Sequence, residues 1–238
     1  MASCARLAIA LVSQDARRRI MLTLAVDTTA DSGSIALMDE SGVRDEVVVH
    51  APQGFSRVLF GEIEGMLARQ KIRLADVDMF AGASGPGSFT GVRVGLSAMK
   101  GLAEVLGKPI AAVSNLEALA EFGSSAARAT IIDARRGEIY GAVYAGAGSL
   151  IVPEIVLPLP KFLDLLPDRE LEWISQDFEP FREALAGTRF DAEPAVQAPA
   201  ALAGAIARIA RRMLARDAAA IEANYVRRSD AELLFKGK

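Results

Sequence analysis

One short pattern occurs twice in this chain: an apolar strand that ends in aspartate, a polar turn, and a returning strand. The first copy contains Asp27 and extends to Met38, and the second contains Asp133, 106 residues later, and extends to Tyr144. Hairpins are common enough for chance to produce such a pair. Because both copies open a stretch of strands followed by helices, the repeat favours a duplicated α/β domain. Each half is then expected to be a mixed sheet with an antiparallel hairpin at its edge.

Hydrophobic periodicity predicts the remaining elements of both halves. In the first half, we expect strands at 22–26, 34–38, 44–49, 77–83 and 109–113, and helices at 56–70, 90–106 and 116–122. In the second half, we expect strands at 130–133, 138–144 and 150–157, short helices at 160–166 and 178–185, and a longer helix around 202–214. These elements divide the chain into an N-terminal lobe, 21–125, and a less regular C-terminal lobe, 126–238.

The composition excludes several kinds of site. Among 238 residues there is one cysteine, Cys4, and one histidine, His50. The chain can therefore form neither an intrachain disulfide nor a metal site built from its own cysteines or from two of its own histidines. The net charge of −3 argues against tight binding of RNA or DNA by this chain alone. No apolar run approaches the roughly 20 residues that a membrane-spanning helix needs. The low cysteine content is typical of the cytoplasm, where we expect the protein to be.

Residues 1–20 differ in character from the rest. Their apolar run, 7–12, precedes Arg17, Arg18 and Arg19, which is the reverse of the order in a secretory signal. The strand-like pattern begins only after Met21. We therefore expect 1–20 to be a disordered extension, or Met21 to be the true start, with a targeting segment as the alternative. Deletion of 1–20 is predicted to leave folding and activity intact.

A glycine-rich segment, 82–93, joins a predicted strand to a predicted helix, which is where phosphate-binding loops occur. It has the glycine spacing of a P-loop, but Ser88 stands where that motif needs lysine, and the third glycine of the dinucleotide fingerprint is missing. Two interpretations remain. In one, the loop holds an anion or a partner through Gly85, Gly87, Ser88, Thr90 and Arg93. In the other, the glycines permit a tight turn, and Ser88 or Thr90 caps the helix.

Asp27 and Asp133 face similar turns at the ends of equivalent strands. Paired aspartates of this kind bind magnesium in actin-like nucleotide phosphotransferases, which usually carry glycine two residues later so that phosphates can approach the backbone. Here those positions are Thr29 and Arg135, which should crowd a triphosphate. An independent ATP-dependent kinase or hydrolase is therefore an alternative that ranks below a structural role for both hairpins. A peptidase is weaker still, because a single histidine and no metal set leave no proteolytic machinery in view.

Three motifs in this order resemble the TsaB (YeaZ) family: residues 24–29, 85–95 and 133–140, with Tyr225, Val226 and Arg227 near the C-terminus. The Gly-Pro-Gly-Ser-Phe-Thr-Gly run, 85–91, is the specific part, and the resemblance extends from about Met21 to the end. It implies an α/β, actin-like (ASKHA) fold of duplicated RNase-H-like lobes with mixed sheets. It also implies a role in forming threonylcarbamoyladenosine next to the anticodon of tRNAs that read codons starting with A.

The resemblance further implies a scaffold or activating subunit with no catalysis of its own. TsaB-like proteins are described as partners of TsaD, a paralogue that carries the metal and transfers the threonylcarbamoyl group, and TsaE, an ATPase, completes the assembly. TsaD-like chains carry a His-x-x-x-His metal motif on the first long helix, whereas this chain has Gln-Gly-Phe-Ser-Arg at 53–57 near that place. We therefore expect no tightly bound cofactor or metal on this chain alone. ATP and metal would belong to the partners, and tRNA would be contacted only through the complex.

The same resemblance places the partner surface on the two helices beside the glycine loop. The helices at 56–70 and 90–106 have more apolar positions than one core-facing stripe needs, so the surplus should form an exposed patch. We expect a homodimer to cover this patch when the protein is free. In the alternative interpretation, all of these side chains belong to the core. The residues expected in the patch are Leu59, Ile63, Met66, Met99 and Leu102.

Overall fold

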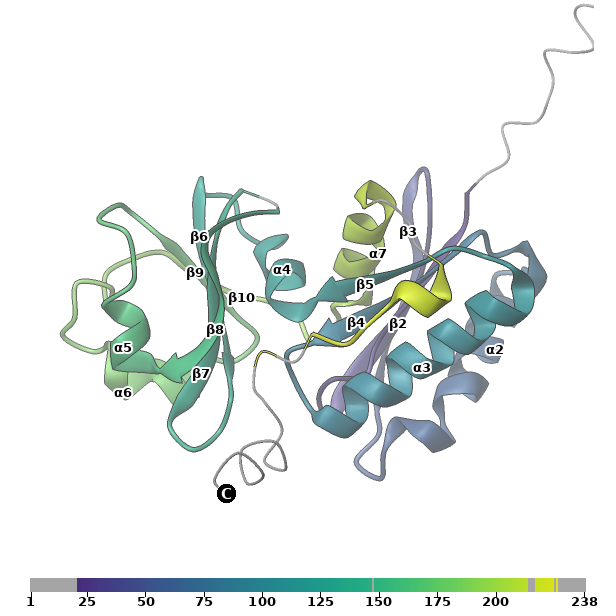
Figure 1. The fold of residues 1–238 in the computed structure, drawn as a ribbon, viewed down its shortest axis with the longest axis horizontal. Helices are drawn as coiled ribbons and strands as arrows, with labels where there is room; N and C mark the ends of the chain where they lie inside the picture. The colour runs from purple at the N-terminus through teal and green to yellow at the C-terminus, as the bar shows by residue number, and fades with distance from the viewer. Residues whose placement is uncertain (1–20, 147, 214–216, 225, 227–238) are drawn as a thin grey trace, which may run out of the picture.

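The first half of the chain folds around a mixed five-stranded sheet, on the right of Figure 1. The computed structural model describes residues 21–146, 148–213, 217–224 and 226. Strands β1, β2 and β3 pair antiparallel through short turns, whereas β4 and β5 join in parallel after helical connections. The order β3-β2-β1-β4-β5 is formed by β1 (Thr23–Asp27), β2 (Ser32–Asp39), β3 (Gly42–His50), β4 (Met79–Gly85) and β5 (Ile110–Ser114).

The second half repeats this arrangement strand for strand. Strands β6, β7 and β8 form the antiparallel meander, and β9 and β10 join in parallel, so the predicted duplication of a mixed α/β unit is confirmed. The sequence pattern does not predict β9 and β10, because strands of four and three residues are too short to show a period. The order β10-β9-β6-β7-β8 is formed by β6 (Ala127–Asp133), β7 (Glu138–Ala145), β8 (Ser149–Pro158), β9 (Glu172–Ser175) and β10 (Ala195–Gln197).

Helices cover the two sheets unequally. In the first lobe, α2 (Leu59–Arg69) and the longer α3 (Phe89–Leu106) cover one face of the sheet and enclose a hydrophobic core (Figure 1). The second lobe has short helices, α5 (Leu159–Leu163) and α6 (Arg182–Leu185). Within the described ranges, no helix combines the length and the apolar character that crossing a bilayer requires. The other helical elements are α4 (Asn115–Ala120), α7 (Ala203–Arg212), η1 (Phe55–Arg57), η2 (Leu74–Asp76), η3 (Glu179–Phe181) and η4 (Ala218–Ala220).

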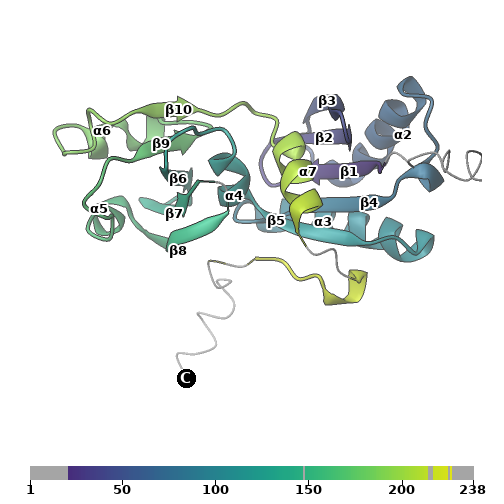
Figure 2. The same cartoon turned by 90° about the horizontal axis from the view of Figure 1, so that it is seen from above.

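Helix α7 returns to the first lobe, although it follows β10 of the second. It packs against β1, β2, β4 and β5 (Figure 2), on a face rich in alanine that lets the alanine-rich helix approach closely. The Ser34 hydroxyl accepts hydrogen bonds from the Leu202 and Ala203 amides, at 3.0 and 2.9 Å. The structure therefore differs from the prediction that 126–238 forms the C-terminal lobe, because residues 203–212 pack on the sheet of the first lobe. An apolar stripe predicts the helix but does not identify the sheet that it covers.

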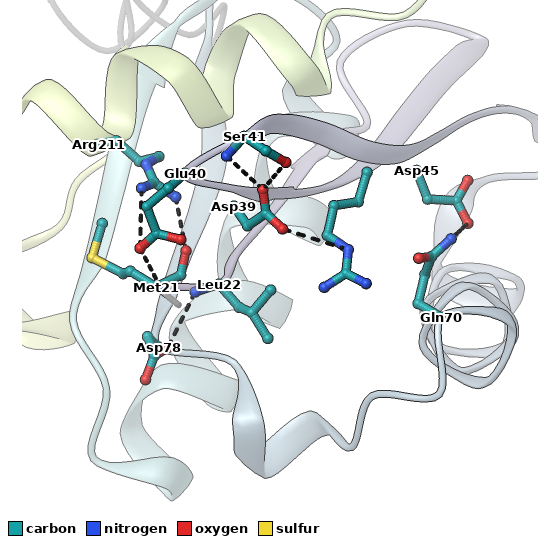
Figure 3. A network of polar contacts seen from close by, with 10 residues as sticks. Met21, Leu22, Asp39, Glu40, Ser41, Asp45, Gln70, Asp78 and Arg211 are labelled. Carbon is teal, nitrogen blue, oxygen red and sulfur yellow. Dashed lines mark hydrogen bonds and ion pairs between the residues drawn. The ribbon is translucent and has the colours of Figure 1, made fainter. Parts of the chain in front are cut away.

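Polar contacts join the beginning of the described chain to α7 (Figure 3). The Leu22 amide donates to Asp78 at 3.1 Å, and the Met21 amide donates to Glu40. Arg211 of α7 donates to the Met21 carbonyl at 2.8 Å, and its guanidinium lies 3.8 Å from Glu40. These contacts hold the first strand and the last helix of the lobe together. The predictions for 1–20, Tyr225 and Arg227 lie outside the described residues.

Candidate functional site

The glycine loop and the start of α3 lie directly on the turn that follows β1. Gly87, Gly91 and Gly95 are spaced four residues apart and face this turn. A Cβ on Gly91 would lie 2.0 Å from the Thr28 carbonyl oxygen, and a Cβ on Gly95 would lie 2.3 Å from the Thr28 hydroxyl. Both distances are far too short for a real contact, so only glycine permits this approach. The loop and the β1 turn therefore form one packed unit. The four-residue spacing of the glycines indicates a close contact along one side of the helix, but it does not identify Thr28 as the residue contacted.

Hydrogen bonds close this unit on both sides. The Ser88 amide donates to the Thr29 carbonyl at 2.7 Å, and the Thr28 hydroxyl donates to the Gly91 carbonyl at 2.7 Å. The Ser88 hydroxyl accepts from the Gly91 amide at 3.3 Å and so caps α3. These contacts support the structural interpretation of Gly87 and Ser88.

The other residues predicted for an anion site lie at the end of β4 and on the first turns of α3. Thr90 and Arg93 are exposed on the first turns of α3. The Arg93 guanidinium stacks on the Phe89 ring, 3.7 Å from its centre. Gly85 ends β4 with a φ of +98°. An anion contact by these residues stays a prediction.

Asp27 lies beneath the packed unit and is 3% exposed. Its Oδ1 accepts from the Thr29 amide at 2.9 Å and from the Thr29 hydroxyl at 2.7 Å, and that hydroxyl accepts from the Asn115 side-chain amide at 2.9 Å. Burial raises the pKa of Asp27 above its usual value of 3.8, against the opposing effect of the hydrogen bonds from Thr29 and Asn115. The position that is usually glycine in actin-like phosphotransferases is thus filled by a buried, hydrogen-bonded side chain.

The equivalent turn of the second lobe is open. The Asp133 side chain is 32% exposed, accepts from the Arg135 amide at 2.8 Å and lies 3.7 Å from the Arg135 guanidinium. Arg135, Arg136 and Gly137 all have left-handed backbones, with φ of 64°, 58° and 76°. Residues with a Cβ disfavour the left-handed region of φ and ψ, so the two arginines are held in a strained turn.

The two turns line a cleft of about 890 Å³ between the lobes. Thr29 and Ser88 belong to one wall, and Tyr140 and Ser175 to the other. Three carboxylates and one guanidinium are among the described lining residues, those of Asp31, Asp133, Asp177 and Arg135. This lining is net acidic, whereas a triphosphate site needs net positive charge or a metal.

No group of three or more histidine, cysteine, aspartate or glutamate side chains in the described part of the chain is arranged to hold a metal ion. His50, at the end of β3, is exposed, and its Nδ1 lies 3.0 Å from the Ser32 hydroxyl.

The structure corrects the predicted partner patch. Leu59, Ile63, Met66 and Met99 are at most 3% exposed and pack in the first lobe's core, and Leu102 is half-buried. The prediction that these side chains form a surface is wrong for the four buried ones, because α2 and α3 turn those positions towards the sheet. The large apolar side chains that α2 and α3 do expose are those of Phe60, Phe89 and Val105.

Comparisons with known proteins agree with this architecture. The family model for TsaD, tRNA N6-adenosine threonylcarbamoyltransferase, matches residues 49–229. The chain is 34% identical over 155 residues to the tRNA threonylcarbamoyladenosine biosynthesis protein TsaB of Bacillus subtilis, covering 63% of this chain and 68% of that protein. It is 34% identical over 128 residues to the protein of the same name from Escherichia coli, covering 52% of this chain and 55% of that protein. The match thus spans about half of the E. coli relative.

Solved structures extend the match to both lobes. YeaZ from Pseudomonas aeruginosa superimposes with a TM-score of 0.73 at 25% identity, covering 86% of this chain and 99% of that one. A second P. aeruginosa structure, described as an uncharacterized protein with similarity to peptidase YEAZ, gives a TM-score of 0.74 at 26% identity, with 87% and 100% covered. The fold is therefore the actin-like pair of mixed-sheet lobes. Its sequence, its two-lobed architecture and its glycine loop together make this chain a member of the TsaB (YeaZ) family.

Proposed function

We propose that this chain is a non-catalytic subunit in the formation of threonylcarbamoyladenosine in tRNA, and that it acts by binding and activating a TsaD-like transferase. The names of its TsaB relatives support involvement in this modification. The filled turn after β1 is the observation that carries the non-catalytic role. There Thr29 is hydrogen-bonded to Asp27 and Asn115, and the glycine loop lies against it. A triphosphate would have to displace these contacts.

In this proposal, the partner proteins bind the ATP, metal and tRNA that the cleft of this chain does not suit. The acidic lining of the cleft favours neither ATP nor an RNA backbone. ATP and metal are bound by the TsaD-like transferase and a TsaE-like ATPase, and tRNA is contacted through the assembled complex.

The transferase is proposed to bind the outer side of α2 and α3. Phe60 on α2, and Phe89 and Val105 near the two ends of α3, expose apolar side chains, and Val105 is 83% exposed. The stacked Arg93 guanidinium holds the Phe89 ring against the helix. Two helices with exposed apolar side chains suit packing against helices of a partner. The free protein would cover these side chains in a homodimer that the transferase replaces.

Co-purification with the TsaD-like transferase of the same organism tests this surface. We expect Phe60→Asp and Val105→Asp to lose the complex while circular dichroism stays unchanged, because each places a charge where an apolar contact forms. Val48→Asp is the matched control, since Val48 is 53% exposed in the same lobe but lies on β3, outside α2 and α3. Complexes that survive both helix substitutions would refute the proposed surface.

A second assay addresses the absence of catalysis. The purified chain is expected to hydrolyse magnesium-ATP and cleave peptides no faster than buffer. ATP turnover that Asp27→Ala abolishes would instead indicate an independent actin-like kinase or hydrolase. Peptide cleavage would indicate the peptidase.

A further inference from the structure

Residues 217–224 lie across the junction of the two lobes. This segment contains η4 and runs beside α3, as the yellow ribbon in Figures 1 and 2 shows. Ala218 and Ile221 are buried in the core of the first lobe. Lys100 of α3 donates to the Ile221 carbonyl at 2.8 Å. The segment is therefore firmly attached to the first lobe along most of its length.

Asn224, at the end of this segment, contacts both lobes. Its amide donates to the Ser84 carbonyl at 2.8 Å, next to the end of β4. A Cβ on Gly85 would lie 3.2 Å from the Asn224 carbonyl oxygen, so glycine at this position of the loop leaves room for the crossing. The Asn224 side-chain amide donates to Glu154 Oε2 of β8, in the second lobe, at 2.5 Å.

Glu154 is held in place to accept this bond. The Tyr144 hydroxyl of β7 donates to Glu154 Oε1 at 2.6 Å, which leaves Oε2 directed at Asn224. A hydrogen bond between an amide and a carboxylate is stronger than one between neutral groups. The bond joins residues 70 positions apart and two lobes that do not share a sheet.

We propose that 217–224 is a strap that holds the two lobes at a fixed angle, with the Asn224–Glu154 bond as its latch. The backbone itself crosses between the lobes after β5 and again between β10 and α7, and such crossings act as hinges when nothing else restrains them. Beside these crossings, α4 packs against strands of both lobes, and Ile174 of β9 lies in the alanine-rich core that α7 forms with the first sheet. The strap adds a separate link, made by one side-chain hydrogen bond to the second lobe. Because the 890 Å³ cleft lies between the lobes, opening the latch changes its width.

Spin-label distances between the lobes of the full chain test the strap. Cysteines replace Gly61 on α2, where a side chain meets open space, and Lys161 on α5, which is exposed, in a Cys4→Ser background. We expect one narrow distance distribution for the otherwise unchanged protein. Asn224→Ala and Glu154→Ala should each broaden or shift it, and the double variant should do no more than either one. Asn224→Asp should shift it further, because two carboxylates would then face each other.

Gln70→Ala is the matched control. It removes an amide that donates to a carboxylate, Asp45, at 3.3 Å within the first lobe (Figure 3), so the distance should not change. Unfolding curves recorded in parallel verify that each variant is folded. An unchanged distribution in folded Asn224→Ala and Asn224→Asp would overturn the proposal. So would equal broadening in Gln70→Ala, or a double variant whose effect is the sum of two independent ones.

Discussion

The two lobes have the same strand–aspartate–turn–strand unit, but only the first buries it. Asp27 is 3% exposed beneath the glycine loop, whereas the Asp133 side chain is 32% exposed at the edge of the cleft. The connections between the parallel strands explain the difference. Between β4 and β5 the chain forms α3, of 18 residues, whose first turns cover the β1 turn. Between β9 and β10 it forms η3 and α6, of three and four residues, which are too short to cover the β6 turn.

This comparison teaches that a duplicated backbone unit does not determine the chemistry of its aspartate. Burial raises the pKa of Asp27, while in the second turn Asp133 accepts a hydrogen bond from the amide of Arg135, which has a left-handed backbone. One turn serves as a packing surface for a helix, and the other is a wall of the cleft.

The largest expected effect comes from filling the space between α3 and the β1 turn. Gly91→Ala should lower the free energy of unfolding by about 3 kcal/mol, since its Cβ would overlap the Thr28 carbonyl. Gly101→Ala on the same helix meets open space and should raise stability by about 1 kcal/mol through helix propensity. Urea unfolding at constant pH measures both. Similar values for the two variants would show that the close approach is not what selects glycine.

A smaller, pH-dependent effect is expected at Asp27. Its pKa is raised in the folded state, so the folded state holds this proton more tightly than the unfolded state. Stability linked to this group is complete below the unfolded pKa and is lost as the pH rises through the folded pKa. Asp27→Asn keeps Oδ1 as an acceptor for Thr29 and removes the ionisation. Relative to the unchanged protein, this variant should therefore gain stability as the pH rises from acid to neutral.

Asp133→Asn is the control for that measurement, because it removes the corresponding carboxylate from the open turn. Thermal unfolding of both variants across the same pH range compares the two lobes directly. If the stability of both variants changed with pH by the same slope, burial of Asp27 in the first lobe would not be the cause of the pH dependence.

The smallest expected effect concerns the strain in the second turn. Arg135→Gly should be more stable than Arg135→Ala by roughly 0.5–1 kcal/mol, because glycine adopts a left-handed backbone without the steric penalty of a Cβ. Both substitutions remove the guanidinium beside Asp133 and keep the backbone amide that donates to it, so their difference isolates the cost of the left-handed backbone. Urea unfolding of the two variants measures the difference in their free energies of unfolding. Equal stabilities would mean that the positive φ of this residue carries no strain.

Much of the fold could be predicted from local pattern. The alternation of apolar residues indicates β1, β2, β6 and β7, and the spacing of apolar residues indicates α2, α3 and α7, because each periodicity arises from neighbouring positions along one element. The glycine loop and the cap at Ser88 are also local. The patch residues Met66 and Met99 were beyond such reasoning, since an apolar helix position indicates burial or a partner equally well.

The repeated unit, the helix that follows the glycine loop and the family resemblance follow from residues close together in the chain. Other features depend on residues far apart. Asp27 is buried because Gly91 of α3 packs against Thr28. Helix α7 packs on the first lobe because the sheet face there is rich in alanine and Ser34 accepts hydrogen bonds from the start of the helix. Asn224 reaches Glu154 only because both lobes are already folded. The sequence pattern indicates which residues can pack in a core. The burial of Asp27, its raised pKa and the contacts between the lobes depend on segments that are distant in the chain and meet only in the folded protein.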